Sequence, residues 1–144
     1  MFAATPGGGS RPFPASGPAP VVALSFTTVP GMGIFSFDVS VGRPVDAYGS
    51  VGLTAQKLVR GAAVEVTVLH VAAGGEIGRH PATADQLFLV TAGRGAVRTG
   101  DDDWEPIGAG QAILWRAGVD HATRAEAGIT AVVVEMEDMP AQAR

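Results

Sequence analysis

The feature that most constrains the fold of this chain is a series of short β-type segments separated by glycine turns. From Leu53 onward, apolar and polar residues alternate in short segments that recur roughly every 8 to 12 residues, as in a sandwich or barrel. The expected strands cover residues 64–70, 86–91, 96–99, 111–115, 119–124 and 129–137. Sharp turns are expected at residues 93–95 and 108–110, and no segment has a long 3.6-residue apolar period. The pattern predicts an all-β fold.

Strand alternation also predicts which side chains share a face. His70 follows three valines on one face of the segment 64–70, so it is a candidate to project into a barrel; the alternative is a core or rim histidine bonded to the backbone. Gln86 shares its face with Phe88 and Val90, which are core-like residues. We therefore expect Gln86 to point inward and to need a hydrogen-bonding partner there.

The spacing of glycines and polar residues is more specific. One series consists of Gly74, His80, Ala82, Gln86 and Gly93, separated by five, one, three and six residues. A second consists of Gly110, Arg116, Gly118 and His121, separated by five, one and two residues. Over roughly residues 64–137 the chain resembles the two motifs of the cupin superfamily. The resemblance implies a jelly-roll β-barrel, in which the family's first motif supplies two histidines and a glutamate, and its second supplies a third histidine, to one metal ion.

The chain departs from those motifs at several positions. Ala82 stands where the second histidine is expected and Gln86 where the glutamate is expected. Arg116 replaces the usual proline, and Ala125 the usual asparagine. The resemblance thus leaves His80, Gln86 and His121 as candidate ligands of a divalent iron, manganese, nickel or zinc ion. These ligands carry no negative charge, so a weakly held metal and a metal-free pocket both stay open.

Two functions follow as expectations. In the first, the barrel binds a small polar or anionic metabolite through His80, Gln86 and His121, with Arg60 as an anion clamp and Phe88 in the pocket wall. In the second, the protein is a metal-dependent enzyme of the dioxygenase or isomerase type that uses His80, Gln86 and His121 as ligands. A metal-free isomerase with one of the histidines as general base is a variant of the second. The sequence does not decide whether the protein is an enzyme.

Length and composition set the remaining limits. The 144 residues suffice for one domain with a buried core. The formal charge of −4 argues against nucleic acid as a partner. No apolar run approaches the length of a membrane span. The absence of cysteine fits a cytoplasmic protein, and the composition is of a bacterial type. We expect a flexible tail at residues 1–20, an N-terminal arm with edge strands at 21–52, and the barrel at 53–140.

The expected assembly is a homodimer. The resemblance to cupins implies pairing through edge strands and exchanged arms, and exposed sheet edges favour cover by a second chain. The segment from Val21 to Phe37 is the expected donor.

Overall fold

The computed structural model describes residues 33–140, and they form an antiparallel β-barrel. The elements are η1 (Val39–Val41), β1 (Arg43–Val45), η2 (Ala47–Gly49), β2 (Val51–Arg60), β3 (Val64–Pro81), β4 (Asp85–Thr99), β5 (Glu105–Gly108), β6 (Ala112–Trp115) and β7 (Asp120–Met136). The expected tail at 1–20, and the expected arm up to residue 32, lie outside the described residues. Within residues 33–140, no helix is long and apolar enough to cross a membrane.

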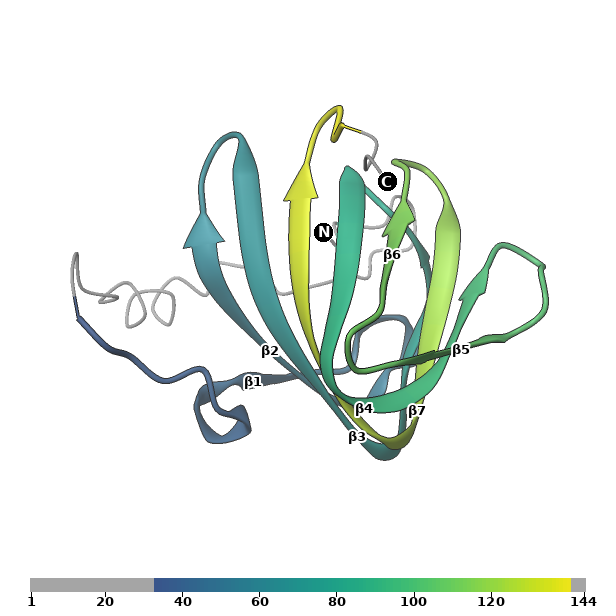
Figure 1. Ribbon diagram of the computed structural model, residues 1–144, viewed down its shortest axis with the longest axis horizontal. Coiled ribbons are helices and arrows are strands. Elements are labelled where there is room, and N and C mark those ends of the chain that lie inside the picture. The colour runs from purple at the N-terminus through teal and green to yellow at the C-terminus, as the bar shows by residue number, and fades with distance from the viewer. Residues whose placement is uncertain (1–32, 141–144) are drawn as a thin grey trace.

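Three long strands build both walls of the barrel. The sheet order is β1-β2-β3-β7-β4-β5, with β6 paired to β4, and every pairing is antiparallel. Strands β3, β4 and β7 contain 18, 15 and 17 residues, each long enough to cross the molecule twice. In Figure 1 they descend through one wall, bend at the bottom and rise through the other wall. The barrel is therefore a folded sheet with β3, β7 and β4 at its centre.

Glycines make the bends possible. Gly93 in β4 has a φ of +83°, and a Cβ atom there would overlap the carbonyl oxygen of Gly128 in β7. The prediction of a turn at residues 93–95 is therefore wrong, because these residues bend a continuous strand instead of ending it. For the same reason the two segments expected at 119–124 and 129–137 form the single strand β7.

The core lies between the two walls. Leu69, Val71, Phe88, Val90, Ile129, Ala131 and Val133 belong to one buried apolar cluster. The inward direction expected for Gln86 is confirmed, since Gln86 is fully buried on the same face as Phe88 and Val90.

His70 does not project into the barrel, and the alternative considered from the sequence, a rim histidine bonded to the backbone, is confirmed. Its neighbours Leu69 and Val71 point into the core, so alternation turns His70 to the outer face. There its Nδ1 lies 3.2 Å from Thr130 Oγ1 and its Nε2 3.0 Å from the carbonyl oxygen of Phe37. The valines that precede His70 in β3 share its face, so their apolar character does not show which face of the strand is inside.

Candidate functional site

The pairing of β3 with β7 brings two buried histidines together inside the barrel. His80 and His121 are direct cross-strand partners and are 1% and 2% exposed. Their ring centroids are 4.4 Å apart, and the ring planes meet at 61°. The two residues at motif spacing in the sequence therefore form one cluster.

Both imidazoles are held in the same tautomer by the backbone. His80 Nδ1 lies 2.7 Å from the carbonyl oxygen of Gly78, and His121 Nδ1 lies 3.0 Å from that of Val119. A carbonyl oxygen only accepts, so each Nδ1 donates its hydrogen. In the neutral rings the lone pair is then on Nε2.

Burial keeps both rings neutral. Desolvation, together with the nearby His121, lowers the pKa of His80 to about 2. Desolvation likewise lowers the pKa of His121 to about 4, although the bond to Val119 and the charge of Asp120 oppose the shift. At neutral pH the pair therefore acts as hydrogen-bond acceptors and carries no positive charge.

Gln86 completes the cluster from β4. Its side chain is fully buried, and Nε2 lies 3.3 Å from His121 Nε2, so the amide donates to the imidazole lone pair. The amide oxygen, Oε1, has no hydrogen-bond partner among residues 33–140. An unsatisfied buried acceptor costs about 1–3 kcal/mol, so this oxygen is suited to receive a donor from a bound molecule.

Two aromatic rings flank the histidines. The indole of Trp115 stacks on His121 with centroids 4.0 Å apart, and the ring of Tyr48 stacks on His80 at 5.0 Å. Trp115 is buried, and the sequence did not indicate its contact with His121. Its Nε1 donates to Thr99 Oγ1 at 2.8 Å, which fixes the indole in place.

Tyr48 reaches the site because η2 docks closely on β3. A Cβ atom at Gly78 would overlap the carbonyl oxygen of Tyr48, and the Gly78 N–H donates to Ser50 Oγ at 3.0 Å. No side chain other than hydrogen fits at Gly78, so the contact depends on glycine. No local pattern in the sequence indicates this approach between two residues that are 30 positions apart.

A row of polar side chains lies beside the cluster on the inner wall. Glu135 in β7 is 4% exposed and pairs across the sheet with Gln86 on one side and Glu65 on the other. Lys57 Nζ lies 2.9 Å from Glu65 Oε2. Burial raises the pKa of Glu65, but the hydrogen bond and the charge of Lys57 lower it by more, so the pKa of Glu65 is lowered overall. Burial also lowers the pKa of Lys57. Sequence reasoning missed this row, although Glu135 falls on the same alternation as Ala131 and Val133.

Of the other two predicted ligand-binding residues, Phe88 borders the cluster and Arg60 does not. Phe88 is 1% exposed, and its ring centroid lies 5.8 Å from that of Trp115, so it borders the cluster. Arg60 is exposed at the end of β2, where its backbone pairs with Glu65. Among the described residues no hydrogen bond or ion pair joins the side chain of Arg60 to the histidines.

The side chains of His80, Gln86 and His121 are not a suitable set of ligands for a tightly held divalent metal. His121 Nε2 already accepts from the amide of Gln86, and Ala82 supplies no donor at the position of the expected second histidine. Within residues 33–140 no group of three or more His, Cys, Asp or Glu side chains is arranged to hold an ion. Two neutral imidazoles and an amide also leave the charge of a divalent cation uncompensated.

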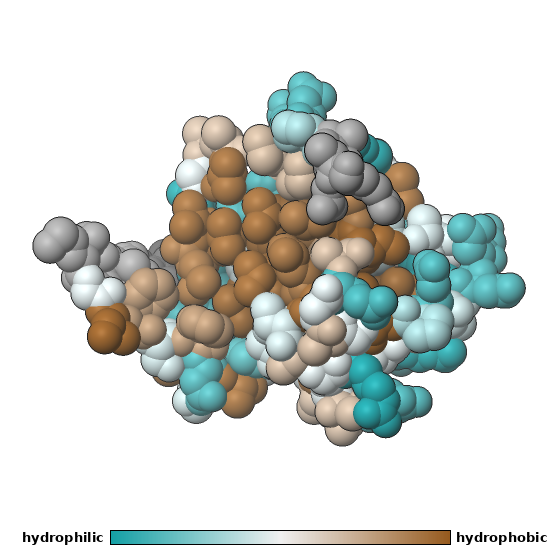
Figure 2. All heavy atoms as spheres, in the orientation of Figure 1, coloured by the Kyte–Doolittle hydropathy of each residue, from teal (hydrophilic) through white to brown (hydrophobic). Residues whose placement is uncertain are grey.

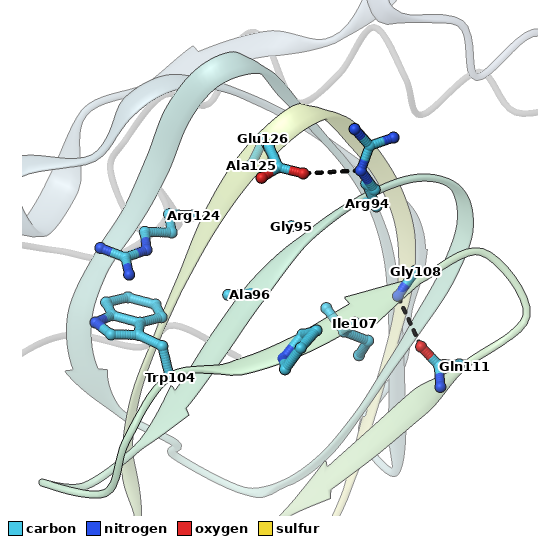
Figure 3. Close-up of a pocket in the computed structure, with 11 residues that line it drawn as sticks. Arg94, Gly95, Ala96, Trp104, Ile107, Gly108, Gln111, Arg124, Ala125 and Glu126 are labelled. Carbon is cyan, nitrogen blue, oxygen red and sulfur yellow. Dashed lines mark hydrogen bonds and ion pairs between the residues drawn. The ribbon is translucent and has the colours of Figure 1, made fainter.

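A separate cavity of about 830 Å³ lies between β4, β5 and β7, and its lining includes Ile107 and Ala125 of the apolar core. Figure 3 shows Arg124 over the ring of Trp104 at one end and the ion pair of Arg94 with Glu126 at the other. The guanidinium carbon of Arg124 is 3.9 Å from the indole centroid, and Arg94 Nε is 2.8 Å from Glu126 Oε1. The histidines do not line this cavity, so the barrel contains two distinct polar regions.

The folded antiparallel sheet with a buried histidine pair defines a jelly-roll barrel of the cupin class. A family model described as a cupin domain matches residues 67–137, which include His80, Gln86 and His121. The chain belongs to the cupin superfamily.

Solved structures agree with this fold. A cupin 2 conserved barrel domain protein from Salinispora arenicola is similar over 76% of this chain and 92% of its own, at 21% identity and a TM-score of 0.62. An RmlC-like cupin family protein from Methanocaldococcus jannaschii, with a double-stranded β-helix fold, is similar over 75% and 93%, at 14% identity and a TM-score of 0.59. KdgF from a Halomonas species is similar over 61% and 82%, at 13% identity and a TM-score of 0.55. No curated protein matches the sequence.

Proposed function

We propose that this cupin binds a small, uncharged, hydroxyl-bearing molecule inside the barrel, at His80, Gln86 and His121. The observation that carries the proposal is the buried Oε1 atom of Gln86, which has no hydrogen-bond partner among residues 33–140 and lies in a cluster with two neutral imidazoles. A hydroxyl group of the ligand would donate to this oxygen and remove its desolvation cost.

The charges near the cluster favour an uncharged ligand over an anion. The low pKa values of His80 and His121 mean that neither ring offers a positive charge at neutral pH. Glu135 lies beside Gln86, and the positive charge of Lys57 is already paired with Glu65. A carboxylate or phosphate ligand would therefore meet acceptors and acidic groups, whereas a hydroxyl group would find acceptors suited to it.

The flanking rings favour a ligand with flat C–H faces. Trp115 and Tyr48 present aromatic surface next to the two imidazoles. Pockets for small polar molecules commonly combine aromatic walls with a few directed polar groups. A polyol or a sugar ring, with hydroxyl groups at its edge and C–H bonds on its faces, has this combination.

Binding is favoured over catalysis by the basicity of the histidines. A general base works best when its pKa is near the working pH, and the pKa values of His80 and His121, about 2 and about 4, are far below neutrality. The metal-dependent enzyme considered from the sequence is the competing function, and its ligands would be the same three residues.

The experiment is a calorimetric titration of the purified full chain with a fixed panel of probes. The panel contains myo-inositol, D-glucose and mannitol as neutral polyols, citrate as an anion, and Zn²⁺, Mn²⁺, Ni²⁺ and Fe²⁺ as metals. We expect a neutral polyol to bind, and Gln86→Leu to weaken that binding about tenfold to a hundredfold, which corresponds to the loss of one or two buried hydrogen bonds.

The matched control is Gln111→Leu. Gln111 is an exposed glutamine whose Oε1 accepts from the Gly108 N–H, outside the histidine cluster, so its loss should leave polyol binding unchanged. Binding of citrate alone would contradict the uncharged ligand. Stoichiometric binding of a metal that is lost in His80→Ala and His121→Ala would support the metal-dependent enzyme instead.

A further inference from the structure

The side chains of three arginines surround Ala96 of β4. Arg124 of β7 is the cross-strand partner of Ala96, and Arg94 and Arg98 lie two positions before and after it in β4. Because Val97 is buried in the core, strand alternation turns Ala96 and its arginine neighbours away from the core. Ala96 contributes only a methyl group, and it lines the cavity between β4, β5 and β7 together with Arg94 and Arg124. The cavity therefore lies beside a group of positive charges.

The guanidinium group of Arg124 is held in position but has no acceptor. It stacks on the indole of Trp104, with its central carbon 3.9 Å from the ring centroid (Figure 3). Within residues 33–140, no hydrogen bond or ion pair engages its N–H groups. Stacking covers the flat face of a guanidinium group and leaves the N–H donors at its edge free. This edge is available to an acceptor from a bound molecule.

The other two arginines already have partners. Arg94 Nε lies 2.8 Å from Glu126 Oε1, and the two side chains are 66% and 69% exposed, so this ion pair is weak and can rearrange. Arg98 donates to the carbonyl oxygens of Asp102, at 2.8 Å, and of Asp101, at 3.4 Å. Two arginines and one glutamate are the charged residues that line the cavity, so its lining has a net charge of +1, whereas the whole chain has −4.

Much of the remaining lining is apolar. It includes Trp104, Pro106 and Ile107. The cavity volume of about 830 Å³ falls within the range of about 300–1,000 Å³ that is typical of sites for small organic molecules. Figure 2 shows hydrophilic residues concentrated on the side of the barrel where the loop between β4 and β5 lies in Figure 1. The cavity thus combines apolar walls with one unpaired positive charge.

We propose that this cavity is a second binding site, for a small monocarboxylate with a flat apolar body, of the kind found in aromatic acids. The carboxylate accepts two hydrogen bonds from the edge of the Arg124 guanidinium group, because the two planar groups have matching geometry. The flat body lies against Trp104, Pro106 and Ile107, which removes apolar surface from water.

The local charges select a single negative charge on the ligand. Arg124 is the one guanidinium group of the lining that has no acidic partner within residues 33–140, so it compensates one carboxylate. Glu126 in the lining and the acidic loop 101–103 repel a second or third negative charge. The site is separate from the one proposed for a polyol, since His80 and His121 do not line this cavity.

The first test is a calorimetric titration of the full chain with benzoate, benzamide, acetate and citrate. Benzamide has the shape of benzoate without its charge, and acetate has the charge without the ring. We expect benzoate to bind at least about tenfold more tightly than either of them, and citrate to bind no better than acetate. Equal affinities for benzoate and benzamide, or no binding of benzoate, would overturn the proposal.

The second test is a set of variants. Arg124 is exposed, so Arg124→Gln leaves the core intact, and it should weaken benzoate binding at least about tenfold. Ala96→Leu should also weaken binding, because the larger side chain fills the cavity while Arg124 stays in place. The matched control is Arg43→Gln, since Arg43 lies in β1, at the opposite end of the sheet order from β5. Equal affinity in Arg124→Gln and Arg43→Gln would show general attraction of anions and overturn the specific site.

The third test locates the bound molecule through the two indole N–H signals in a proton–nitrogen correlation spectrum. The chain has two tryptophans, and Trp104→Phe assigns their signals. Benzoate should shift the signal of Trp104, which lines the cavity, and leave that of Trp115, which stacks on His121. Gln86→Leu should leave the benzoate shift unchanged. A benzoate shift at Trp115 and none at Trp104 would place the carboxylate in the histidine cluster and overturn the proposal.

Discussion

The indole of Trp115 lies almost parallel to the imidazole of His121, with ring centroids 4.0 Å apart and planes inclined by 16°. The same imidazole donates through Nδ1 to the Val119 carbonyl and accepts from the amide of Gln86. His121 is therefore held by a stacked ring and by two hydrogen bonds, and the side chain has little freedom to change its position. This arrangement also makes Trp115 a reporter of the charge on His121.

The fluorescence of Trp115 should follow the protonation of His121. The Trp104→Phe variant leaves Trp115 as the single tryptophan, since the chain contains two. A protonated imidazole in contact with an indole quenches its emission, so we expect a decrease with a midpoint near pH 4, the pKa that burial gives His121. The His121→Gln variant in the same background should lack the step. A midpoint near pH 6.5 would contradict the burial of this ring.

Folding stability should fall when the pH drops below about 6.5. The pKa values of His80 and His121 are lowered in the folded state, so between about pH 4 and 6.5 the unfolded chain binds protons that the folded chain does not. Stability is therefore fully present above the unfolded pKa and is lost as the pH falls. At pH 5 the expected loss is on the order of 2 kcal/mol per histidine.

Urea denaturation at pH 7, 6 and 5 measures this loss. In His121→Gln the decrease between pH 7 and pH 5 should be about half of that in the wild type, because one of the two buried histidines is gone. A free energy of unfolding that stays constant from pH 7 to pH 5 would show that the histidines titrate normally in the folded chain.

The bend in β4 should tolerate no side chain at Gly93. Gly93→Ala combines a φ of +83° with an overlap between the new methyl group and the Gly128 carbonyl, so we expect a loss of about 3 kcal/mol or more. Gly100→Ala is the control, because Gly100 also has a positive φ, +55°, but a Cβ there would meet no atom within 4 Å. It should cost only about 1–2 kcal/mol. Equal losses in thermal denaturation would mean that the contact with Gly128 plays no part.

Strand alternation predicted an all-β fold and the inward position of Gln86, and the resemblance to the cupin motifs implied the barrel. They could not tell a turn from a bend, because a glycine with positive φ serves in both, and residues 93–95 proved to be a bend. They left His70 open between the barrel interior and the rim, because alternation separates two faces of a strand without showing which one is inside.

The neighbours of the histidines were harder to predict. Tyr48 reaches His80 through a close approach of η2 to Gly78, a contact that depends on tertiary packing and leaves no local pattern. Glu135 lies next to Gln86 because of the register between β7 and β4, and a single sequence does not contain this register. The sequence indicated His80, Gln86 and His121 as residues of the site. The structure shows the tautomers of the two histidines, the aromatic rings that stack on them and the acidic residue next to Gln86.

The most direct test of the proposed site is a nitrogen-15 spectrum of the histidine rings and glutamine side chains at pH 7, recorded with and without the polyol that binds best. We predict neutral rings protonated at Nδ1 for His80 and His121, and, on addition of the polyol, shifts at their Nε2 atoms and at the Gln86 amide. Protonated rings, or shifts produced by citrate or Zn²⁺ and not by any polyol, would contradict a site for an uncharged hydroxyl-bearing ligand.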